Sequence, residues 1–377
     1  MAVVIFKAIE KCNSNCIYCE VIKKKQDEIM NYDLLRLIFI RMNEYLLSNP
    51  REKITFTWHG GEVCMLGHKY FETALKIQNE YCPETKSRIY HQVQSNLTLL
   101  TQPLIDIFLK LGIRQIGSSF EPIHNIRGFG KNRNSELYNR KFLEGVKLLN
   151  KNNMTWGIIY VVHKLSLERP LDIFYFLTNL NTRSHPNFNQ VKLYGEDKSN
   201  LAITGEEFAD FLGAIFPIWY KNMDRYPNIQ PFSQYVKSVR DKDFSLICES
   251  SGVCSYRWIY IGPEGDTSQC GRTGDHNVMD YGNIKDYSFE EIMKNPLRHK
   301  LVERQKILPE TECRDCRFWG ICHGGCPLDA YMTNNKLLSR SPRCEITKVF
   351  IEKYFEPVTG MHVDFKPQEY IKEVHYT

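Results

Sequence analysis

The sequence predicts an α/β protein in which an open barrel of six strand and helix units precedes a smaller domain organised by metal. Two observations lead to this fold class. From residue 2 to about residue 195, short β-branched or aromatic runs alternate with amphipathic stretches at helical spacing, which is typical of βα units around a parallel sheet. After about residue 200 this alternation fades, and the stretch from Cys248 to Cys344 is predicted to be a region of turns that contains eight cysteines.

The alternation locates each element of the barrel. We expect strands at residues 3–8, 54–58, 89–94, 115–119, 156–162 and 190–194. We expect helices at residues 32–47, 70–81, 103–111, 137–150 and 171–177, followed by helices at 205–220 and 349–355, and an exposed loop at 23–28. The predicted segments are therefore a barrel over residues 1–200, a helical bridge over 201–247, a cysteine-rich domain over 248–345, and a C-terminal helix and tail over 346–377.

Composition excludes several classes of protein. The 377 residues are 42% hydrophobic and 25% charged, with no apolar run of the ~18 residues that a membrane span needs and no secretory signal at the start. The net charge of +5 is spread along the chain, so we expect no nucleic-acid partner. Thirteen cysteines in a chain that reads as cytoplasmic are better explained as metal ligands than as disulfides.

The first cysteine group follows the first predicted strand. Cys12, Cys16 and Cys19 have the spacing C-x3-C-x2-C. Three thiolates from one loop can hold three irons of a [4Fe-4S] cube and leave the fourth iron without a protein ligand. A structural zinc site is the alternative, but it needs a fourth Cys or His at ordinary spacing, and none lies between Cys19 and His59.

This triplet, with Tyr18 directly before its third cysteine, resembles the radical S-adenosylmethionine (SAM) superfamily. The resemblance implies an open (β/α)6 partial TIM barrel. It also implies that SAM binds the open iron and is reductively cleaved to a 5′-deoxyadenosyl radical, and that Tyr18 belongs to the SAM site.

A glycine-rich stretch after the second strand strengthens the resemblance. Trp58-His59-Gly60-Gly61-Glu62 is similar to the superfamily motif that binds the methionine amino group of SAM. In that role Gly60 and Gly61 let the backbone approach the ligand, and Glu62 accepts a hydrogen bond from the ammonium.

Two later stretches resemble the superfamily with departures. Gln94 and Asn96 match a Gln-Thr-Asn motif, but Leu97 stands where a glycine is usual, so the backbone is expected to differ there. Ser119 and Arg127 match a Ser-x-Asp-Gly-Pro…His…Arg stretch and would contact the SAM carboxylate.

The second cysteine group resembles the SPASM extension of radical SAM enzymes, which holds two auxiliary [4Fe-4S] clusters. Eight thiolates make two complete four-thiolate sites, so the chain would carry three clusters in all. The interleaved pattern of the family assigns Cys248, Cys254, Cys270 and Cys326 to auxiliary cluster I, and Cys313, Cys316, Cys322 and Cys344 to auxiliary cluster II. Only Cys64 and Cys82 remain, and we expect both to be small buried hydrophobes. Two four-cysteine zinc sites stay an alternative.

The resemblance implies an oxidation of a peptide side chain, because two auxiliary clusters offer a route for one electron. The layout is close to that of peptide maturases and anaerobic sulfatase-maturating enzymes. The latter carry an aspartate as base directly after the cysteine that matches Cys270, whereas this chain has Gly271. We therefore favour a maturase that crosslinks a ribosomally made peptide, with Asp275, Glu121 and Arg272 as candidates for the base. The alternatives are formylglycine formation, peptide epimerisation and a non-catalytic zinc-organised binding module.

The expected partners follow from this chemistry. They are a precursor peptide and an external one-electron reductant of the flavodoxin or ferredoxin type. Because Cys12 lies almost at the start of the chain, a leader peptide would be recognised by a separate protein, the barrel mouth or the C-terminal tail.

Overall fold

The computed structural model describes residues 1–19, 28–180, 186–194, 197, 199–244 and 248–367. The chain forms two compact units, which we describe separately. The first unit contains Met1–Ile159 and Ser255–Arg298, and the second contains Tyr160–Cys254 and His299–Thr377. The domain limits predicted from the sequence divide the chain by its motifs instead, and they stay a prediction.

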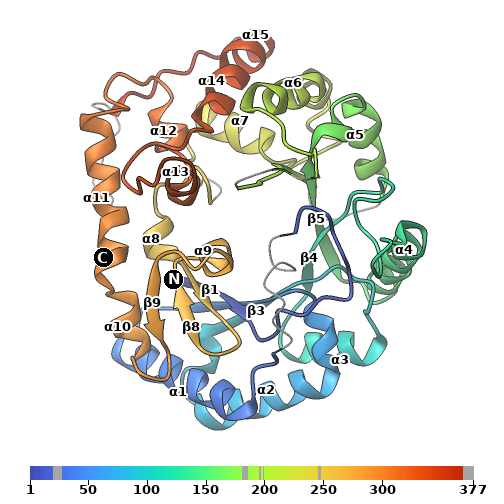
Figure 1. The fold of residues 1–377 in the computed structure, drawn as a ribbon, viewed down its shortest axis with the longest axis vertical. Helices are drawn as coiled ribbons and strands as arrows, with labels where there is room; N and C mark the ends of the chain where they lie inside the picture. The colour runs from blue at the N-terminus through green and yellow to red at the C-terminus, as the bar shows by residue number, and fades with distance from the viewer. Residues whose placement is uncertain (20–27, 181–185, 195–196, 198, 245–247, 368–377) are drawn as a thin grey trace. The chain divides into compact units, whose positions relative to one another are not determined.

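A parallel sheet forms the centre of the first unit (Figure 1). Its strands are β1 (Ala2–Lys7), β2 (Ile54–His59), β3 (Ile89–Gln94), β4 (Gln115–Ser119) and β5 (Thr155–Val162), which continues into the second unit after residue 159. They are hydrogen-bonded in the order β5-β4-β3-β2-β1, and each neighbouring pair is parallel. The first five strands predicted from the sequence are confirmed.

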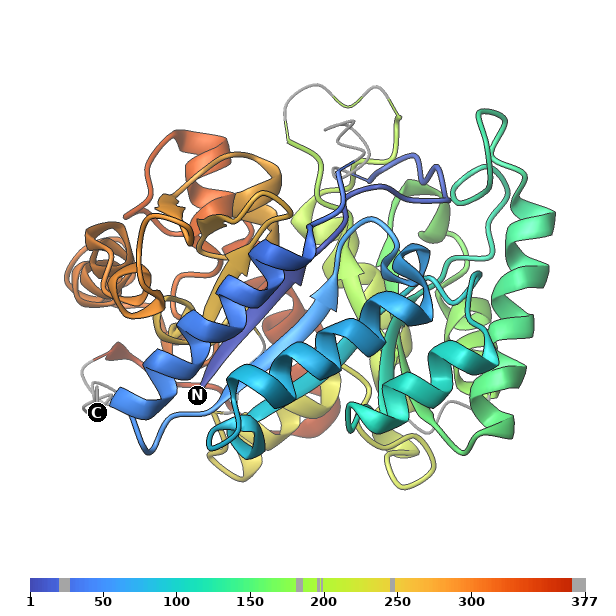
Figure 2. The ribbon, with the colours of Figure 1, turned by 90° about the horizontal axis from the view of Figure 1, so that it is seen from below.

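Helices connect these strands, as the sequence predicts. They are α1 (Tyr32–Ser48), α2 (Gly67–Tyr81), α3 (Gln102–Lys110) and α4 (Ser135–Lys151), with short 3-10 turns η2 (Val63–Leu66) and η3 (Lys86–Arg88). Figure 2 shows α1, α2 and α3 side by side over one face of the sheet. Asn31 starts α1 by accepting a hydrogen bond from the Leu34 N–H. Beneath the helices, Phe6 contacts Phe56 and Trp58 at ring distances of 5.1 and 4.9 Å.

A later part of the chain returns to the same sheet. It contains β7 (Trp258–Ile261), β8 (Asp266–Ser268), α9 (Gly271–Asp275), β9 (Asp280–Asn283) and α10 (Phe289–Met293). β7 pairs with β1 in parallel, and β8 and β9 continue the sheet in antiparallel order. The strand β1 is therefore flanked on both sides, and α9 contacts it.

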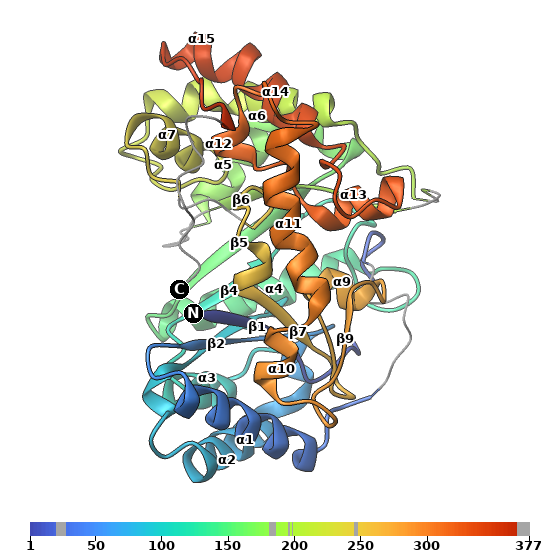
Figure 3. The same ribbon diagram turned by 90° about the vertical axis from the view of Figure 1, so that its left-hand side faces the viewer.

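The second unit is mainly helical. Its elements include η4 (Lys164–Ser166), α5 (Pro170–Asn179), β6 (Pro186–Gln190), α6 (Gly205–Lys221), α7 (Phe232–Arg240), α12 (Trp319–Cys322), α13 (Pro327–Asn334), α14 (Cys344–Phe350), the π-helix η5 (Ile351–Phe355) and α15 (Glu356–Thr359). Figure 3 shows α14 and α15 beside α6. Phe216 of α6 contacts Phe232 and Phe350 at 5.4 and 5.3 Å in the core of this unit.

Two predictions from the sequence are wrong. The sixth strand is β6 at Pro186–Gln190 instead of residues 190–194. One of its buried residues is Gln190, whose side-chain amide donates to Ile203 O and Thr204 O. These hydrogen bonds allow a polar side chain to be buried in the strand, which a search for alternating apolar residues does not detect. The region after residue 248, where we expect turns, contains the short α8 (Cys254–Arg257) and the 15-residue α11 (Pro296–Glu310), in which buried arginines interrupt the apolar stripe.

Some expectations fall outside the described residues. These are the loop at 23–28, of which only Glu28 is described and is exposed, and the last part of the tail at 368–377. Among the helices of the described ranges, none has the length and apolar character needed to cross a membrane.

Candidate functional site

The N-terminal cysteine loop leaves β1 at the edge of the sheet where the parallel strands end. Backbone hydrogen bonds attach it to the segment after β4. Asn15 N–H donates to Gly128 O at 2.8 Å, and Ile17 N–H donates to Ile126 O at 3.0 Å. The loop is therefore fixed at the strand ends, where active sites of β/α barrels gather.

The thiols of this loop are suited to a bound metal. All thirteen cysteines are free thiols, and Cys12, Cys16 and Cys19 are partly buried. Ser14 contacts two of them, through its N–H to Cys12 Sγ at 3.4 Å and its hydroxyl to Cys16 Sγ at 3.2 Å. Burial raises the pKa of the Cys12 thiol well above its ordinary value, and its neighbours Cys16 and Cys19 raise this pKa further. Metal coordination would offset that cost, because it deprotonates a thiol outright.

Gly60 and Gly61 pack on the backbone that leads into the cysteine loop. A Cβ on Gly60 would lie 1.9 Å from Ile9 O, and a Cβ on Gly61 would lie 2.3 Å from both Glu10 O and Lys11 O. Gly60 also has a φ of +143°, which L side chains rarely adopt. Both glycines are therefore required by the contact between two loops, which the motif alone does not reveal.

Glu62 is a buried carboxylate that accepts hydrogen bonds from neutral donors. Its Oε1 accepts from Cys64 N–H at 2.9 Å and the Ser95 hydroxyl at 2.7 Å, and its Oε2 accepts from Asn96 N–H at 2.7 Å. Burial raises its pKa, and these neutral donors lower it again. Within the part of the chain that the structure describes, no Lys or Arg pairs with Glu62, so its surroundings are complementary to a cationic ligand.

The end of β3 connects to the cysteine loop through side chains. Asn96 donates from Nδ2 to Asn13 Oδ1 at 2.9 Å, and Asn13 donates to Thr98 Oγ1 at 2.8 Å. Gln94 lies over β4, because a Cβ on Gly117 would be 2.1 Å from Gln94 Oε1. Gln94 and Asn96 thus hold the loop and the sheet edge, and their contact with SAM stays a prediction.

Leu97 adopts a backbone conformation in the left-handed region, where glycine is the usual residue. Its φ is +62° and its side chain is fully buried. The space comes from Gly145 of α4, where a Cβ would lie 2.4 Å from Leu97 O and 2.9 Å from Leu97 Cβ. Gly145 makes room for Leu97 in the left-handed region, and the expectation that the backbone here differs from that of the family stays a prediction.

Arg127 is already bound to two other predicted site residues. Its guanidinium forms a buried ion pair with Glu121 and donates to the Tyr18 hydroxyl, which itself donates to Glu121 Oε2 at 2.6 Å. A SAM carboxylate at Arg127 would have to share it with Glu121. Ser119 is the half-buried last residue of β4.

A buried ion pair joins the end of β1 to α9. Lys7 Nζ, 1% exposed, pairs with Asp275 Oδ1. His59 lies opposite Lys7 in the β1 and β2 register. Burial, followed by the charge of Lys7, lowers the pKa of His59 to about 4, so its ring is neutral at pH 7. Sequence reasoning finds Asp275 as a candidate but misses Lys7, whose only signal is a lysine at the end of an apolar strand.

The residues after Cys270 form α9, with Cys270 as its N-cap. A Cβ on Gly271 would lie 3.8 Å from Lys7 Cε and 3.1 Å from Ile5 Cγ2. The side chain of Asp275 therefore reaches the same lysine that an aspartate at position 271 would face. Arg272, the third candidate for the base, is half-buried in α9.

The cysteines assigned to auxiliary cluster I fall in both units. Cys270 belongs to the first unit, whereas Cys248, Cys254 and Cys326 belong to the second. Cys248 and Cys254 are hydrogen-bonded to each other through their side chains, which raises the pKa of Cys248.

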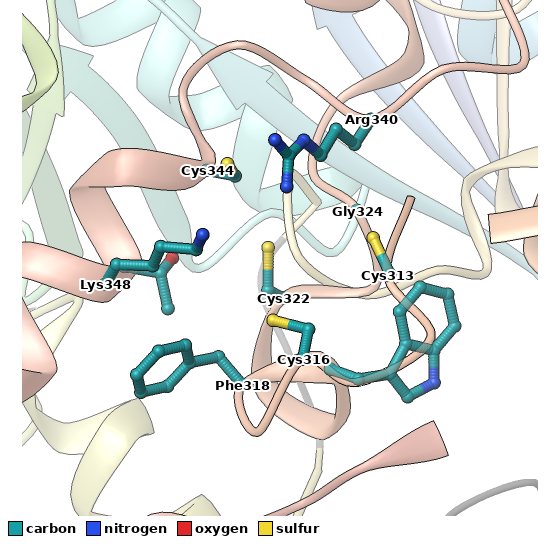
Figure 4. A pocket seen from close by; sticks show the side chains of 10 residues that line it. Cys313, Cys316, Phe318, Cys322, Gly324, Arg340, Cys344 and Lys348 are labelled. Carbon is teal, nitrogen blue, oxygen red and sulfur yellow. The ribbon is translucent and has the colours of Figure 1, made fainter. Parts of the chain in front are cut away.

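The four cysteines assigned to auxiliary cluster II line one pocket in the second unit. These are Cys313, Cys316, Cys322 and Cys344 (Figure 4). Arg340 and Lys348 also line it, and Figure 4 shows both head groups reaching toward the thiols. Four thiols and two cations in one pocket suit an anionic thiolate-bound cluster.

No compact site for a single ion is present in the described ranges. There, no three His, Cys, Asp or Glu side chains are grouped closely enough to hold one metal ion. A four-iron cube instead takes one thiolate per iron.

Two family models match these two cysteine regions. The Radical SAM superfamily model matches residues 7–177, and the SPASM model, an iron-sulfur cluster-binding domain, matches residues 253–317. The chain combines a radical SAM domain with a SPASM domain. These domains imply iron-sulfur clusters and SAM as cofactors. Together with the enzyme relatives, they identify the chain as an enzyme.

Relatives and solved structures cover nearly the whole radical SAM and SPASM chain. It is 24% identical to a serine-type anaerobic sulfatase-maturating enzyme of Bacteroides thetaiotaomicron, over 96% of this chain and 90% of that one. It is 23% identical to a cysteine-type enzyme of Clostridium perfringens, over 94% and 96%.

Among solved structures, native anSMEcpe with bound AdoMet gives a TM-score of 0.80 at 20% identity, over 96% of this chain and 98% of that one. SuiB of Streptococcus suis bound to its precursor peptide SuiA gives 0.59 at 16% identity, over 91% and 75%. Both show the fold, and the expected partial barrel with its SPASM region is confirmed.

Cys64 and Cys82, which the cluster pattern leaves over, are both buried. Cys64 contacts the Ser95 hydroxyl at 3.3 Å, and Cys82 donates to Phe39 O at 3.4 Å. This confirms the expectation that both pack as small core residues in the radical SAM domain.

Proposed function

We propose that this radical SAM protein oxidises a side chain of a peptide by removing two hydrogens. The pocket lined by Cys313, Cys316, Cys322 and Cys344 carries the proposal. It provides a four-thiol site in addition to the open C-x3-C-x2-C loop, and a fully ligated cluster there has no position for SAM. Such a cluster therefore transfers electrons or stabilises the fold, and an oxidation requires electron transfer.

The proposed ligand sets follow the motifs of the radical SAM and SPASM families that the cysteines resemble. Cys12, Cys16 and Cys19 would hold the SAM cluster, with Glu62 binding the SAM ammonium. The two sets of four later cysteines would hold auxiliary clusters I and II, which makes three cubes. When bound, these cofactors supply the radical that takes one hydrogen atom from the peptide and the acceptor for the one electron that the side chain then loses.

The chain itself must supply the acceptor of the remaining proton. Asp275 is our candidate, because its carboxylate lies at the carboxyl end of β1, where Lys7 holds it. Buried ion pairs contribute little net stability, so such a pair at a barrel edge points to a role in the reaction. Glu121 fits this role less well, since Arg127 and Tyr18 both bind it.

The proposed substrate is a ribosomally made precursor peptide, and the proposed product is a crosslink. SuiB, with which the chain shares its fold, is described as bound to a precursor peptide. An external reductant of the flavodoxin or ferredoxin type, a cytoplasmic location and a separate leader-binding protein complete the proposal.

The first test is anaerobic purification followed by reduction with SAM. We expect roughly twelve irons and twelve sulfides per chain from three cubes, and release of 5′-deoxyadenosine. A colourless protein that contains zinc would contradict the proposal. With a peptide encoded beside the gene, mass spectrometry should find a loss of two hydrogens, whereas an unchanged mass with deuterium uptake would mean epimerisation.

Formylglycine formation is the second candidate. The similarity to sulfatase-maturating enzymes over 96% of the chain favours it, and so does the position of Asp275 beside Lys7. A sulfatase-type peptide with Ser or Cys distinguishes the two functions, because only formylglycine formation gives an aldehyde.

A pair of variants tests the base under either function. Asp275→Asn should lower product formation at least about tenfold while 5′-deoxyadenosine is still released. Adding Gly271→Asp should restore product, because position 271 faces the same lysine. If Asp275→Asn forms product at the rate of the unmodified enzyme, Asp275 is not the base.

A further inference from the structure

Arg304 is a fully buried cation in the second unit. It lies on α11 with 1% of its surface exposed. Its guanidinium donates to Gly324 O at 2.6 Å, to Ser339 O at 3.1 Å and to His323 O at 3.5 Å. Two of these carbonyls belong to the loop between Cys322 and Cys326, so Arg304 supports the segment that joins a ligand of each auxiliary cluster.

The hydrogen-bond partners of Arg304 are all neutral. In the described ranges of the chain no carboxylate pairs with it. The nearby groups that can become negative are four thiols: those of Cys326, Cys322, Cys313 and Cys254. Burial lowers its pKa and these thiols, when ionised, raise it. Cys254 and Cys326 belong to the proposed cluster I, and Cys313 and Cys322 belong to cluster II.

A buried guanidinium needs an anionic partner. Carbonyl oxygens satisfy its N–H groups, but they do not compensate the loss of hydration of the full charge. A cube with four thiolates carries a net negative charge, and one-electron reduction makes that charge larger by one. A cation fixed among the thiolates therefore stabilises the reduced form more than the oxidised form.

We propose that Arg304 is the internal counter-charge of the auxiliary clusters and raises their reduction potentials. This inference rests on the proposed cluster ligands and adds to them a residue that sets how readily the clusters accept an electron. Arg304 acts through the cluster environment and does not touch the substrate, so it is a positioning residue.

Arg340 and Lys348, the two cations that line the cysteine pocket, differ from Arg304 in exposure. Arg340 is 41% exposed and has Glu312 at 3.7 Å, and Lys348 is half-buried at the pocket wall. Water and salt screen an exposed charge strongly. Arg340 therefore provides a matched control, as a cation at the same pocket that is open to solvent.

The experiment compares Arg304→Gln, Arg304→Lys and Arg340→Gln by redox titration of the reconstituted protein, followed by electron paramagnetic resonance. Arg88→Gln controls for losing a guanidinium bound only by backbone carbonyls, because Arg88 donates to Leu46 O, Asn49 O and two further carbonyls in the first unit. Iron content and thermal unfolding are measured on the same samples.

We expect Arg304→Gln to lower the equilibrium constant for reducing an auxiliary cluster about tenfold, or about 59 mV for one electron. Arg304→Lys should stay near the unmodified protein, and the other two controls should shift much less than Arg304→Gln. If Arg304→Gln loses iron while Arg304→Lys keeps it, the need for a cation is also supported.

Two results would overturn the inference. One is equal potentials in Arg304→Gln and Arg304→Lys. The other is equal loss of iron in both, which would mean that Arg304 only braces the loop through carbonyls. A zinc-containing unmodified protein without iron would instead remove the proposed function itself, before any variant is compared.

Discussion

Glu62 in the first unit and Arg304 in the second are both buried charges whose hydrogen-bond partners are neutral. Glu62 is 1% exposed and accepts from two backbone N–H groups and a hydroxyl. Arg304 is equally buried and donates to three backbone carbonyls. The two sites are alike in construction and opposite in sign.

The difference in sign indicates what each site is built to receive. A carboxylate without a cation is complementary to a positively charged ligand, and SAM carries an ammonium and a sulfonium. A guanidinium without a carboxylate is complementary to an anionic group, as thiolate-bound cubes are. Each charge would then be compensated only when its cofactor is present.

Other buried charges near the barrel edge are compensated within the chain. Lys7 pairs with Asp275, and Arg127 pairs with Glu121. These pairs can form without any ligand. The contrast between paired and unpaired charges can therefore be tested by changing one partner at a time.

The largest expected effect separates the two cysteine regions. Cys16→Ala should abolish 5′-deoxyadenosine release, at least about a thousandfold or ~4 kcal/mol in the barrier, because the SAM cluster loses a ligand. Cys322→Ala should keep that release and lose the peptide product. Each variant should lose roughly four irons. Cys82→Ala, a buried cysteine outside both regions, is the control for core disturbance.

The next effect tests Glu62 as the partner of an ammonium. Glu62→Gln should weaken SAM binding about tenfold to a hundredfold, which is ~1.4 to 3 kcal/mol, because the charge is removed with little change in shape. Equilibrium dialysis measures this. Methylthioadenosine, which lacks the methionine amino group of SAM, should bind both proteins alike, and equal weakening for it would indicate a collapsed site. The exposed Glu44→Gln is the control.

The sequence predicts a helix or strand correctly where its local pattern of apolar residues matches the residues that the folded chain buries. Strands β1 to β5 and their helices follow the alternation, since each buries one apolar set. The return of β7 to the sheet is not visible in this way, because its partner β1 lies some 250 residues earlier and only the folded chain brings Trp258 opposite Val3. The prediction for β6 is displaced because Gln190 is buried through hydrogen bonds.

The same reasoning explains what could be predicted of the site. Cysteine motifs are local information, and the family pattern that they resemble assigns to one cluster the four thiols that line the pocket. Pairing of Lys7 with Asp275 joins residues 268 positions apart, and nothing local marks it. Arg304 looks like an ordinary helix-surface charge until its burial is known.

The next prediction concerns the space that Gly145 leaves for Leu97, and its expected effect is smaller. Gly145→Ala should destabilise the protein by about 1–3 kcal/mol, because its Cβ would lie 2.4 Å from Leu97 O. Chemical denaturation measures the change. Lys147→Ala, on the exposed face of the same helix, should change the unfolding free energy by less than about 0.5 kcal/mol. A neutral Gly145→Ala would mean that α4 moves away freely.

The smallest effect concerns a buried group that, unlike Arg304, can give up its charge. Trp58 Nε1 donates to His91 Nδ1 at 3.1 Å, so Nε2 carries the proton and donates to Gln78 Oε1 at 2.9 Å. Burial lowers the pKa of His91 to about 4, from the ordinary value of 6.5 for an exposed ring. Between those values the unfolded chain binds the proton and the folded chain does not. Stability must therefore fall as pH falls from 6.5, by up to about 1.4 kcal/mol per pH unit.

Replacing His91 should remove that part of the pH dependence. The unfolding free energy of His91→Gln, measured between about pH 7.5 and 5.5, should decline less steeply than that of the unmodified protein, whereas the exposed His299→Gln should keep the full slope. Identical slopes for His91→Gln and the unmodified protein would show that the folded ring takes up its proton at the same pH as the unfolded chain. At lower pH His91 would then be a second buried cation with neutral hydrogen-bond partners, like Arg304. The contrast between charges that need a ligand and a core that stays neutral would fail in the first unit.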